Sequence, residues 1–259
     1  MNKEKLKSIA NNLIDTFFKA GNTAKEFSHR GVKIVIKKDK TPVTDGDLAV
    51  DEMLRNKILT LTPDIPIISE ETVNINQQNK SKNFWLIDPI DGTKEYIRKK
   101  QEYTLNAALI INLKPALGII YAPEKDRLFY SYGHGDAYEI DNGKIKQLNC
   151  KKKTEKGKIF AIHHSSEPTD DILKVHKENK VSSFVKMSSS LKFCVIAAGE
   201  ADLFVARPRA YEWDIAAGHA ILEHSGGYVT TLDRKKILYG KSEYKNPAIL
   251  VKRSKNLSI

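Results

Sequence analysis

The stretch Phe84-Trp85-Leu86-Ile87-Asp88-Pro89-Ile90-Asp91-Gly92-Thr93 joins an apolar run to two carboxylates. Four apolar residues in succession predict a strand that is buried on both faces. Pro89 and Gly92 then turn the backbone out of the sheet, which leaves Asp88 and Asp91 at the carboxyl end of the strand. Open α/β sheets bind their ligands at such strand ends. The stretch therefore predicts a functional site as well as a buried strand.

Two carboxylates on one stiff turn indicate a divalent cation. At about 4 Å, two like charges repel by roughly 4 kcal/mol at an effective dielectric constant of about 20, and a cation between them removes that cost. Helix capping is the alternative interpretation, because Asp is a favoured N-cap residue. A second element, Trp213-Asp214-Ile215-Ala216-Ala217-Gly218, also places an acid at the start of a small-residue helix. Two such elements are difficult to explain by capping alone.

These two elements resemble the paired signatures of the inositol monophosphatase superfamily, the lithium-sensitive, magnesium-dependent phosphatases. Further segments are similar to the bacterial 3'(2'),5'-bisphosphate nucleotidases of this superfamily. They are Lys94-Glu95-Tyr96, Glu102-Tyr103-Thr104-Leu105-Asn106-Ala107-Ala108-Leu109, Gly118-Ile119-Ile120-Tyr121-Ala122-Pro123 and Ser189-Ser190-Leu191-Lys192-Phe193. The resemblance covers most of the chain. It implies a mixed α+β and α/β fold, the layered αβαβα sandwich of the family, with the site between two halves.

The residue pattern of the first half predicts helices and an antiparallel sheet. A 3.6-residue apolar rhythm begins at Leu6 and predicts an amphipathic helix that ends near Gly21. Apolar and polar residues alternate over 32–36, which predicts a half-exposed strand. A second helix is expected over 48–61. Strands are expected at 104–112, 117–121, 127–132 and 136–140, the last of them closed by the hairpin signal Asp141-Asn142-Gly143.

The second half alternates strands with helices, which is typical of an α/β layer. Apolar runs occur at 159–162, 183–187, 202–206, 226–231 and 247–251, and helical segments at 169–178, 189–198 and 214–225. The lysine-rich stretch 144–158 interrupts the pattern. We therefore place a boundary between an N-terminal half, 1–150, with most of the predicted metal ligands, and a C-terminal half, 151–259, with Asp214 and the substrate-binding elements.

Composition narrows the protein class. The 259 residues are 41% apolar and carry a formal net charge of +11. This charge is typical of a protein that binds nucleic acid, an anionic membrane surface or a small anionic substrate. Cys150 and Cys194 are too few and too far apart for a disulfide scaffold or a zinc site. We see no signal peptide and no run long enough to span a bilayer, so we expect a cytoplasmic protein. Peripheral contact with the inner membrane, as in some relatives, is left open.

The predicted metal ligands are all oxygen donors, which suits Mg²⁺ and disfavours zinc. By resemblance, Asp88 bridges two ions, Glu70 and the backbone carbonyl of Ile90 complete one of them, and Asp91 with Asp214 holds the other. A third ion is left open. Glu71, beside Glu70, is expected to be a helper or a surface residue.

The resemblance also implies the catalytic groups. Thr93 and Asp47 are expected to orient a metal-activated water and accept its proton, while the amides of Gly92 and Thr93 hold the phosphate. Asp47 also suits a capping role before the helix at 48–61, and Asp45 is close enough to share its function.

Substrate contacts rest on weaker signals. We expect Ser190, Lys192 and Arg209 to contact the substrate. The other expected substrate contacts are the metal ligands Glu70, Ile90, Asp91 and Asp214 and the phosphate-holding pair Gly92 and Thr93. For Lys192 a solvated helix lysine is the alternative. We interpret His163, His164, His219 and His224 as structural, because His219 and His224 lack the i, i+4 spacing of paired ligands on a helix.

The leading hypothesis is a magnesium-dependent nucleotidase that hydrolyses adenosine 3',5'-bisphosphate to AMP and phosphate, the salvage step beside sulfate assimilation. An inositol monophosphatase or a broad sugar phosphatase is the enzymatic alternative. A non-catalytic, basic nucleic-acid-binding protein is the alternative of another class, but the five predicted site acids argue against it. We therefore expect a small bisphosphorylated nucleotide as partner and no stable nucleic acid, in a monomer or a homodimer.

Overall fold

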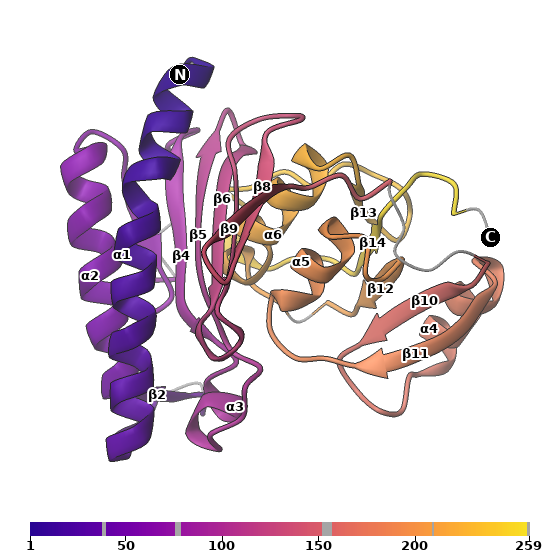
Figure 1. Ribbon diagram of the computed structural model, residues 1–259, viewed down its shortest axis with the longest axis horizontal. Coiled ribbons are helices and arrows are strands. Elements are labelled where there is room, and N and C mark those ends of the chain that lie inside the picture. The colour runs from indigo at the N-terminus through magenta and orange to yellow at the C-terminus, as the bar shows by residue number, and fades with distance from the viewer. Residues whose placement is uncertain (38–39, 76–78, 152–156, 209, 258–259) are drawn as a thin grey trace.

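The computed structural model describes residues 1–37, 40–75, 79–151, 157–208 and 210–257, and these residues form five layers (Figure 1). Two helices, α1 (Lys3–Arg30) and α2 (Asp45–Leu61), cover the outer face of a seven-stranded sheet. On its other face lie α5 (Leu191–Ala197) and α6 (Glu212–His224), followed by a five-stranded sheet and then α4 (Asp170–Glu178). This confirms the predicted αβαβα sandwich.

The seven-stranded sheet is antiparallel except for its first pair, β3 and β4, which is parallel. In spatial order its strands are β3 (Ile67–Ser69), β4 (Phe84–Asp91), β5 (Thr104–Ile111), β6 (Lys114–Ala122), β7 (Arg127–Ser131), β8 (Ala137–Asp141) and β9 (Lys144–Gln147). The antiparallel strands predicted from 104 onward are confirmed. The sequence pattern missed β9, because all four of its residues are exposed and it carries no apolar face.

Strand β4 is buried on both faces, as its apolar run predicts. Phe84 and Leu86 belong to the core between the two sheets, whereas Trp85 and Ile87 belong to the core under α1 and α2. The indole N–H of Trp85 donates to the hydroxyl of Thr62 at 2.9 Å, so this buried polar group is satisfied. A continuous apolar run is therefore required here, since both sides of the strand face a core.

Helix α1 continues well beyond Gly21, so the predicted end of this helix is wrong. Ala24 and Ser28 are buried and continue the buried face of the helix. Because both residues are small, they add little to the apolar periodicity from which a helix is predicted. The helix ends at Gly31, whose φ of 89° lies in the left-handed region.

The five-stranded sheet mixes parallel and antiparallel pairs. In spatial order its strands are β11 (Val181–Lys186), β10 (Ile159–His163), β12 (Leu203–Ala206), β14 (Ile249–Lys252) and β13 (Tyr228–Thr231). Its outer face packs on α4 through a small cluster that includes Ile172 and Leu203. The predicted strands and helices of the second half are confirmed. The division into halves at residue 150 stays a prediction.

The remaining elements are short. They are β1 (Ile34–Ile36), β2 (Pro42–Thr44), α3 (Thr93–Ile97) and the 3-10 helices Pro123–Lys125 and Ser242–Tyr244. The half-exposed alternation expected at 32–36 is wrong for β1, because all three of its side chains are exposed in a two-stranded sheet with β2.

Among the described helices, none is long and apolar enough to cross a membrane. The cytoplasmic location and the contact with the inner membrane stay predictions.

Helix α6 approaches the seven-stranded sheet closely at Gly118 of β6. A Cβ atom at this position would lie 2.4 Å from the carbonyl oxygen of Ala217. The absence of a side chain therefore lets the α6 backbone contact the sheet, and α6 is the helix that carries Asp214.

We expect Gly118→Val to lower the free energy of unfolding by about 1–3 kcal/mol, the usual cost of overpacking a core. The added side chain forces α6 away from β6 and moves Asp214 with it, so stabilisation by Mg²⁺ should weaken too. Urea unfolding with and without Mg²⁺ measures both effects. Ala116→Val, at a partly buried position on the same strand, is the control. Unchanged stability of Gly118→Val would contradict the close contact.

Candidate active site

The acidic turn lies where β4 leaves the sheet. The pairing of β4 with β5 is interrupted between Asp88 and Asp91, and α3 begins at Thr93. Gly92, between Asp91 and Thr93, has a φ of +97°, and a Cβ atom there would lie 2.9 Å from the carbonyl oxygen of Glu102. Only glycine fits this turn without strain. The local sequence thus fixes both aspartates at a strand end.

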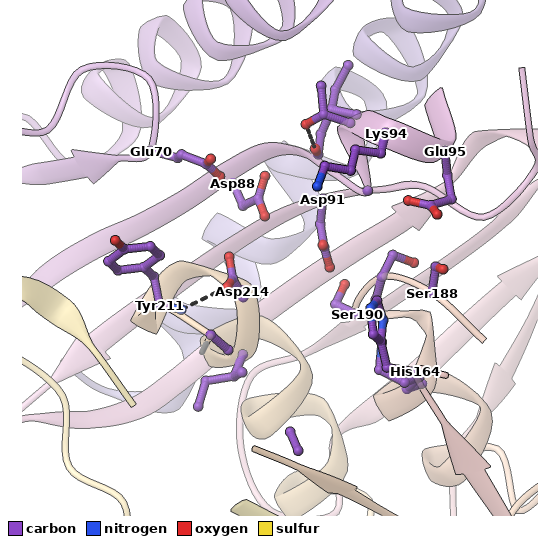
Figure 2. Close-up of a pocket in the computed structure, with 18 of the residues that line it drawn as sticks. Glu70, Asp88, Asp91, Lys94, Glu95, His164, Ser188, Ser190, Tyr211 and Asp214 are labelled. Carbon is purple, nitrogen blue, oxygen red and sulfur yellow. Dashed lines mark hydrogen bonds between the residues drawn. The ribbon is translucent and has the colours of Figure 1, made fainter. Parts of the chain in front are cut away.

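Three carboxylates from distant parts of the chain meet at this turn. Glu70 follows β3, Asp88 is on β4 and Asp214 is in the first turn of α6; each offers an oxygen within 4.8 Å of the other two. Parallel pairing of β3 with β4 brings Glu70 into place, and its N–H donates to the carbonyl of Ile87 at 3.1 Å. Figure 2 shows Asp91 pointing into the same pocket.

The cluster is electrostatically unfavourable without a cation. Burial and the charges of Glu70, Asp91 and Asp214 raise the pKa of Asp88 well above its ordinary value. Burial also raises the pKa of Glu70, against the attraction of Lys37. One oxygen of Asp88, Oδ1, is buried and has no hydrogen-bond partner among the described residues. An orphaned carboxylate oxygen among other oxygen donors fits a hard cation such as Mg²⁺.

Asp47 lies beside the cluster, at the start of α2. Its Oδ2 accepts hydrogen bonds from the backbone N–H and the hydroxyl of Thr44, in a capping box. Its Oδ1 lies 3.4 Å from the hydroxyl of Thr93, which is also 3.1 Å from the carbonyl oxygen of Ile90. Burial raises the pKa of Asp47 to about 6. Asp47 therefore caps α2 and also faces Thr93.

The neighbouring Asp45 has a different environment. Its Oδ1 accepts from the backbone N–H of Lys33 at 2.9 Å, and its Oδ2 lies 3.5 Å from the guanidinium of Arg30. These contacts hold Asp45 away from Thr93, whereas Oδ1 of Asp47 lies 3.4 Å from the Thr93 hydroxyl. The geometry therefore favours Asp47 over Asp45 for the role at Thr93.

Lys37 is a site residue that the sequence gave no reason to choose. Its ammonium lies 3.5 Å from Glu70 and 2.8 Å from Glu71. The side chain of Glu71 is only 4% exposed, so the surface alternative is wrong and the helper alternative stays a prediction. Lys37 was one of many scattered lysines, and only the three-dimensional contact distinguishes it.

The pocket extends from the carboxylates to a wall of basic and hydroxyl groups, in a cavity of about 420 Å³. Lys192 and Ser190 line it, as does His164, which we had interpreted as structural. Lys192 donates to the carbonyl of Ser189, and the Ser190 hydroxyl donates to Asn106 at 2.6 Å. The signal for His164 was its place directly after β10, at a strand end. Arg209 lies outside the described residues.

Comparison with known proteins identifies the family of the chain. Residues 5–257 match the model of the "Inositol monophosphatase family". The chain is 35% identical to the 3'(2'),5'-bisphosphate nucleotidase CysQ of Escherichia coli O157:H7, over 84% of this chain and 88% of that protein. CysQ of Buchnera aphidicola is 36% identical over 83% of this chain and 80% of its own length.

A solved structure shows the same fold over nearly the whole chain. The crystal structure of CysQ from Bacteroides thetaiotaomicron, described as a bacterial member of the inositol monophosphatase family, superposes with a TM-score of 0.78 at 27% identity. The superposition covers 95% of this chain and 97% of that one.

We expect Asp88→Asn to raise the melting temperature of the chelated protein, because the substitution removes a buried charge from the cluster. It should also abolish most of the stabilisation by Mg²⁺, which at 100 times the dissociation constant is about 2.7 kcal/mol for one site. Thermal unfolding with EDTA or Mg²⁺ measures both changes. Asp64→Asn, at an exposed position, is the control. Equal Mg²⁺ stabilisation of Asp88→Asn and wild type would contradict the metal site.

The raised pKa of Asp47 predicts a pH dependence of stability in the chelated protein. An acid whose pKa is higher in the fold stabilises the protein below its unfolded pKa and loses that contribution as pH rises through the folded value. The window therefore runs from the ordinary 3.8 to about 6.

Asp47→Asn has no such loss, so its stability relative to wild type should increase from pH 4 to 6 and then level off. Urea unfolding of both proteins across this range measures the difference. His224, whose pKa burial lowers to about 4, contributes to both proteins alike and cancels. A difference that is constant with pH would contradict the assignment.

Proposed function

Because the chain belongs to the inositol monophosphatase family, we propose that it is a magnesium-dependent 3'(2'),5'-bisphosphate nucleotidase that hydrolyses adenosine 3',5'-bisphosphate to AMP and phosphate. The observation that supports this substrate is a single pocket with a carboxylate cluster at one end and His164 at the other (Figure 2), and with Lys192 in the same lining. A substrate with two phosphates uses both ends. An inositol monophosphate uses only one.

The acidic end would hold the ions. Glu70, Asp88, Asp91, Asp214 and the backbone carbonyl of Ile90 are the proposed ligands for two Mg²⁺ ions, and a third ion is left open. When bound, such ions supply a nucleophilic water at neutral pH and neutralise the charge that develops on the leaving oxygen.

Thr93 and Asp47 are the proposed proton acceptors. The Thr93 hydroxyl has one proton, which it gives to Asp47 as it takes one from the attacking water. The pKa of Asp47, raised by burial to about 6, suits a base that works near neutral pH. The capping contacts from Thr44 hold the carboxylate in place, so its free oxygen stays directed at Thr93.

The remaining groups position the substrate. Gly92 and Thr93 line the pocket beside the carboxylates, and their N–H groups would donate to the phosphate that is cleaved. Lys192 and His164 would contact the second phosphate, which stays on the product. Ser190 also lines the pocket, and its hydroxyl is held in place because it donates to Asn106 and lies 2.9 Å from the hydroxyl of Thr104.

We expect the specificity constant for adenosine 3',5'-bisphosphate to exceed that for inositol 1-phosphate, with phosphate release that requires Mg²⁺ and is inhibited by lithium. Lys192→Met should lower kcat/KM for the bisphosphate by about 10- to 100-fold, the value of a hydrogen bond between charged groups. Its activity on inositol 1-phosphate should change little, since that substrate has no second phosphate.

Lys100→Met, at an exposed position outside the pocket, is the control for the lost charge. A preference for inositol 1-phosphate would favour the inositol monophosphatase alternative. Binding of RNA or DNA without phosphate release from any substrate would overturn the enzymatic proposal.

A further inference from the structure

A second cavity, of about 470 Å³, lies along the C-terminal part of α6. It is built from the start of β6, the loop after β7, the residue Lys151, the turn between α6 and β13, and the segment 236–238. Glu223 in its wall lies roughly 13 Å along the helix axis from Asp214, at a rise of about 1.5 Å per residue. None of its lining residues also lines the candidate active site.

Three lysines from separate segments surround this cavity. Lys114, Lys151 and Lys236 have no carboxylate partner among the described residues. The adjacent Lys235, by contrast, pairs with Asp233 at 2.7 Å. Lysines that converge without counter-ions produce a positive potential, which attracts an anion.

A buried imidazole faces the same cavity. His219 is 2% exposed, and its Nδ1 lies 2.8 Å from the hydroxyl of Tyr239. Its Nε2 lies 3.2 Å from Oε1 of Glu223, but this contact lacks hydrogen-bond alignment, and the atom has no other partner in the described part of the chain. This imidazole atom is itself buried, whereas the side chain of Glu223 is 37% exposed. A ligand in the cavity therefore meets the carboxylate of Glu223, which the imidazole supports from behind.

The cavity also has an apolar wall. The side chains of Tyr228 and Leu238 are 40% and 46% exposed, and Pro115 lies on the same lining. Exposed apolar groups beside convergent polar groups are typical of small-molecule sites. The single carboxylate of Glu223 is outnumbered by the three lysines, so the lining keeps a net positive charge.

We propose that this cavity binds a small organic phosphate with an apolar or aromatic part. The phosphate lies among Lys114, Lys151 and Lys236, and the apolar part contacts Tyr228 and Leu238. A hydroxyl or amino group of the ligand donates to the carboxylate of Glu223. The site is separate from the proposed nucleotidase pocket, so it does not depend on the function proposed above.

Pyridoxal 5'-phosphate tests the site, because it combines a phosphate, an aromatic ring and an aldehyde. The aldehyde condenses with a lysine amine and releases water, and borohydride then reduces the imine to a stable secondary amine. Labelling of the full chain in EDTA, followed by peptide mass spectrometry, locates the modified lysines. We expect Lys114, Lys151 or Lys236 to react several-fold faster than the exposed Lys144 and Lys146 of β9.

Tyr228→Ala should slow this labelling without changing that of Lys144 and Lys146, because the ring loses its contact while every lysine remains. Phenyl phosphate should protect the cavity lysines better than inorganic phosphate at equal concentration. Labelling spread evenly over the exposed lysines, or confined to Lys94 and Lys192 of the active-site pocket, would overturn the proposal. Equal protection by the two phosphates would overturn the apolar part of the site.

Discussion

Mutual repulsion among buried carboxylates is the constraint on which the active-site architecture depends. Glu70, Asp88 and Asp214 each offer an oxygen within 4.8 Å of the other two, and Asp91 adds its charge to theirs. No local segment of the chain would adopt this arrangement by itself. The parallel pair β3 and β4 fixes two of the acids, and a helix packed between two sheets fixes the third. The cores on both sides of β4 supply the burial energy that opposes the repulsion.

Helix α6 connects the two sheets and carries one edge of the site. The carboxylate of Glu212, at its start, is fully buried and accepts from the backbone N–H groups of Gly240 and Lys241 at 2.8 and 2.9 Å. The carboxylate of Asp214 accepts from the N–H of Tyr211 at 2.8 Å, which caps the same helix. These contacts fix the helix start. The position of Asp214 relative to Asp88 is therefore determined by the packing of the whole sandwich.

Sequence reasoning found what local patterns encode and missed what only tertiary contacts decide. The apolar run before Asp88 predicted the buried strand and its acidic end, because both follow from neighbouring residues. The length of α1 and the strand β9 were missed, since small buried residues and a fully exposed strand give little apolar periodicity. Lys37 joins the acidic cluster only through contacts across the fold, whereas for His164 the strand end that precedes it was a signal that sequence reasoning did not use. The chemical roles of the site residues remain predictions.

The ion pair of Lys37 with Glu70 and Glu71 has a consequence for how the pocket fills. Six acids meet at this corner, and three lysines pair with them or line the pocket, so the corner stays acidic within a strongly basic protein. A bisphosphate that arrives first meets repulsion from these acids, whereas a dication meets attraction. The charge of this corner therefore favours binding of the cation before the nucleotide.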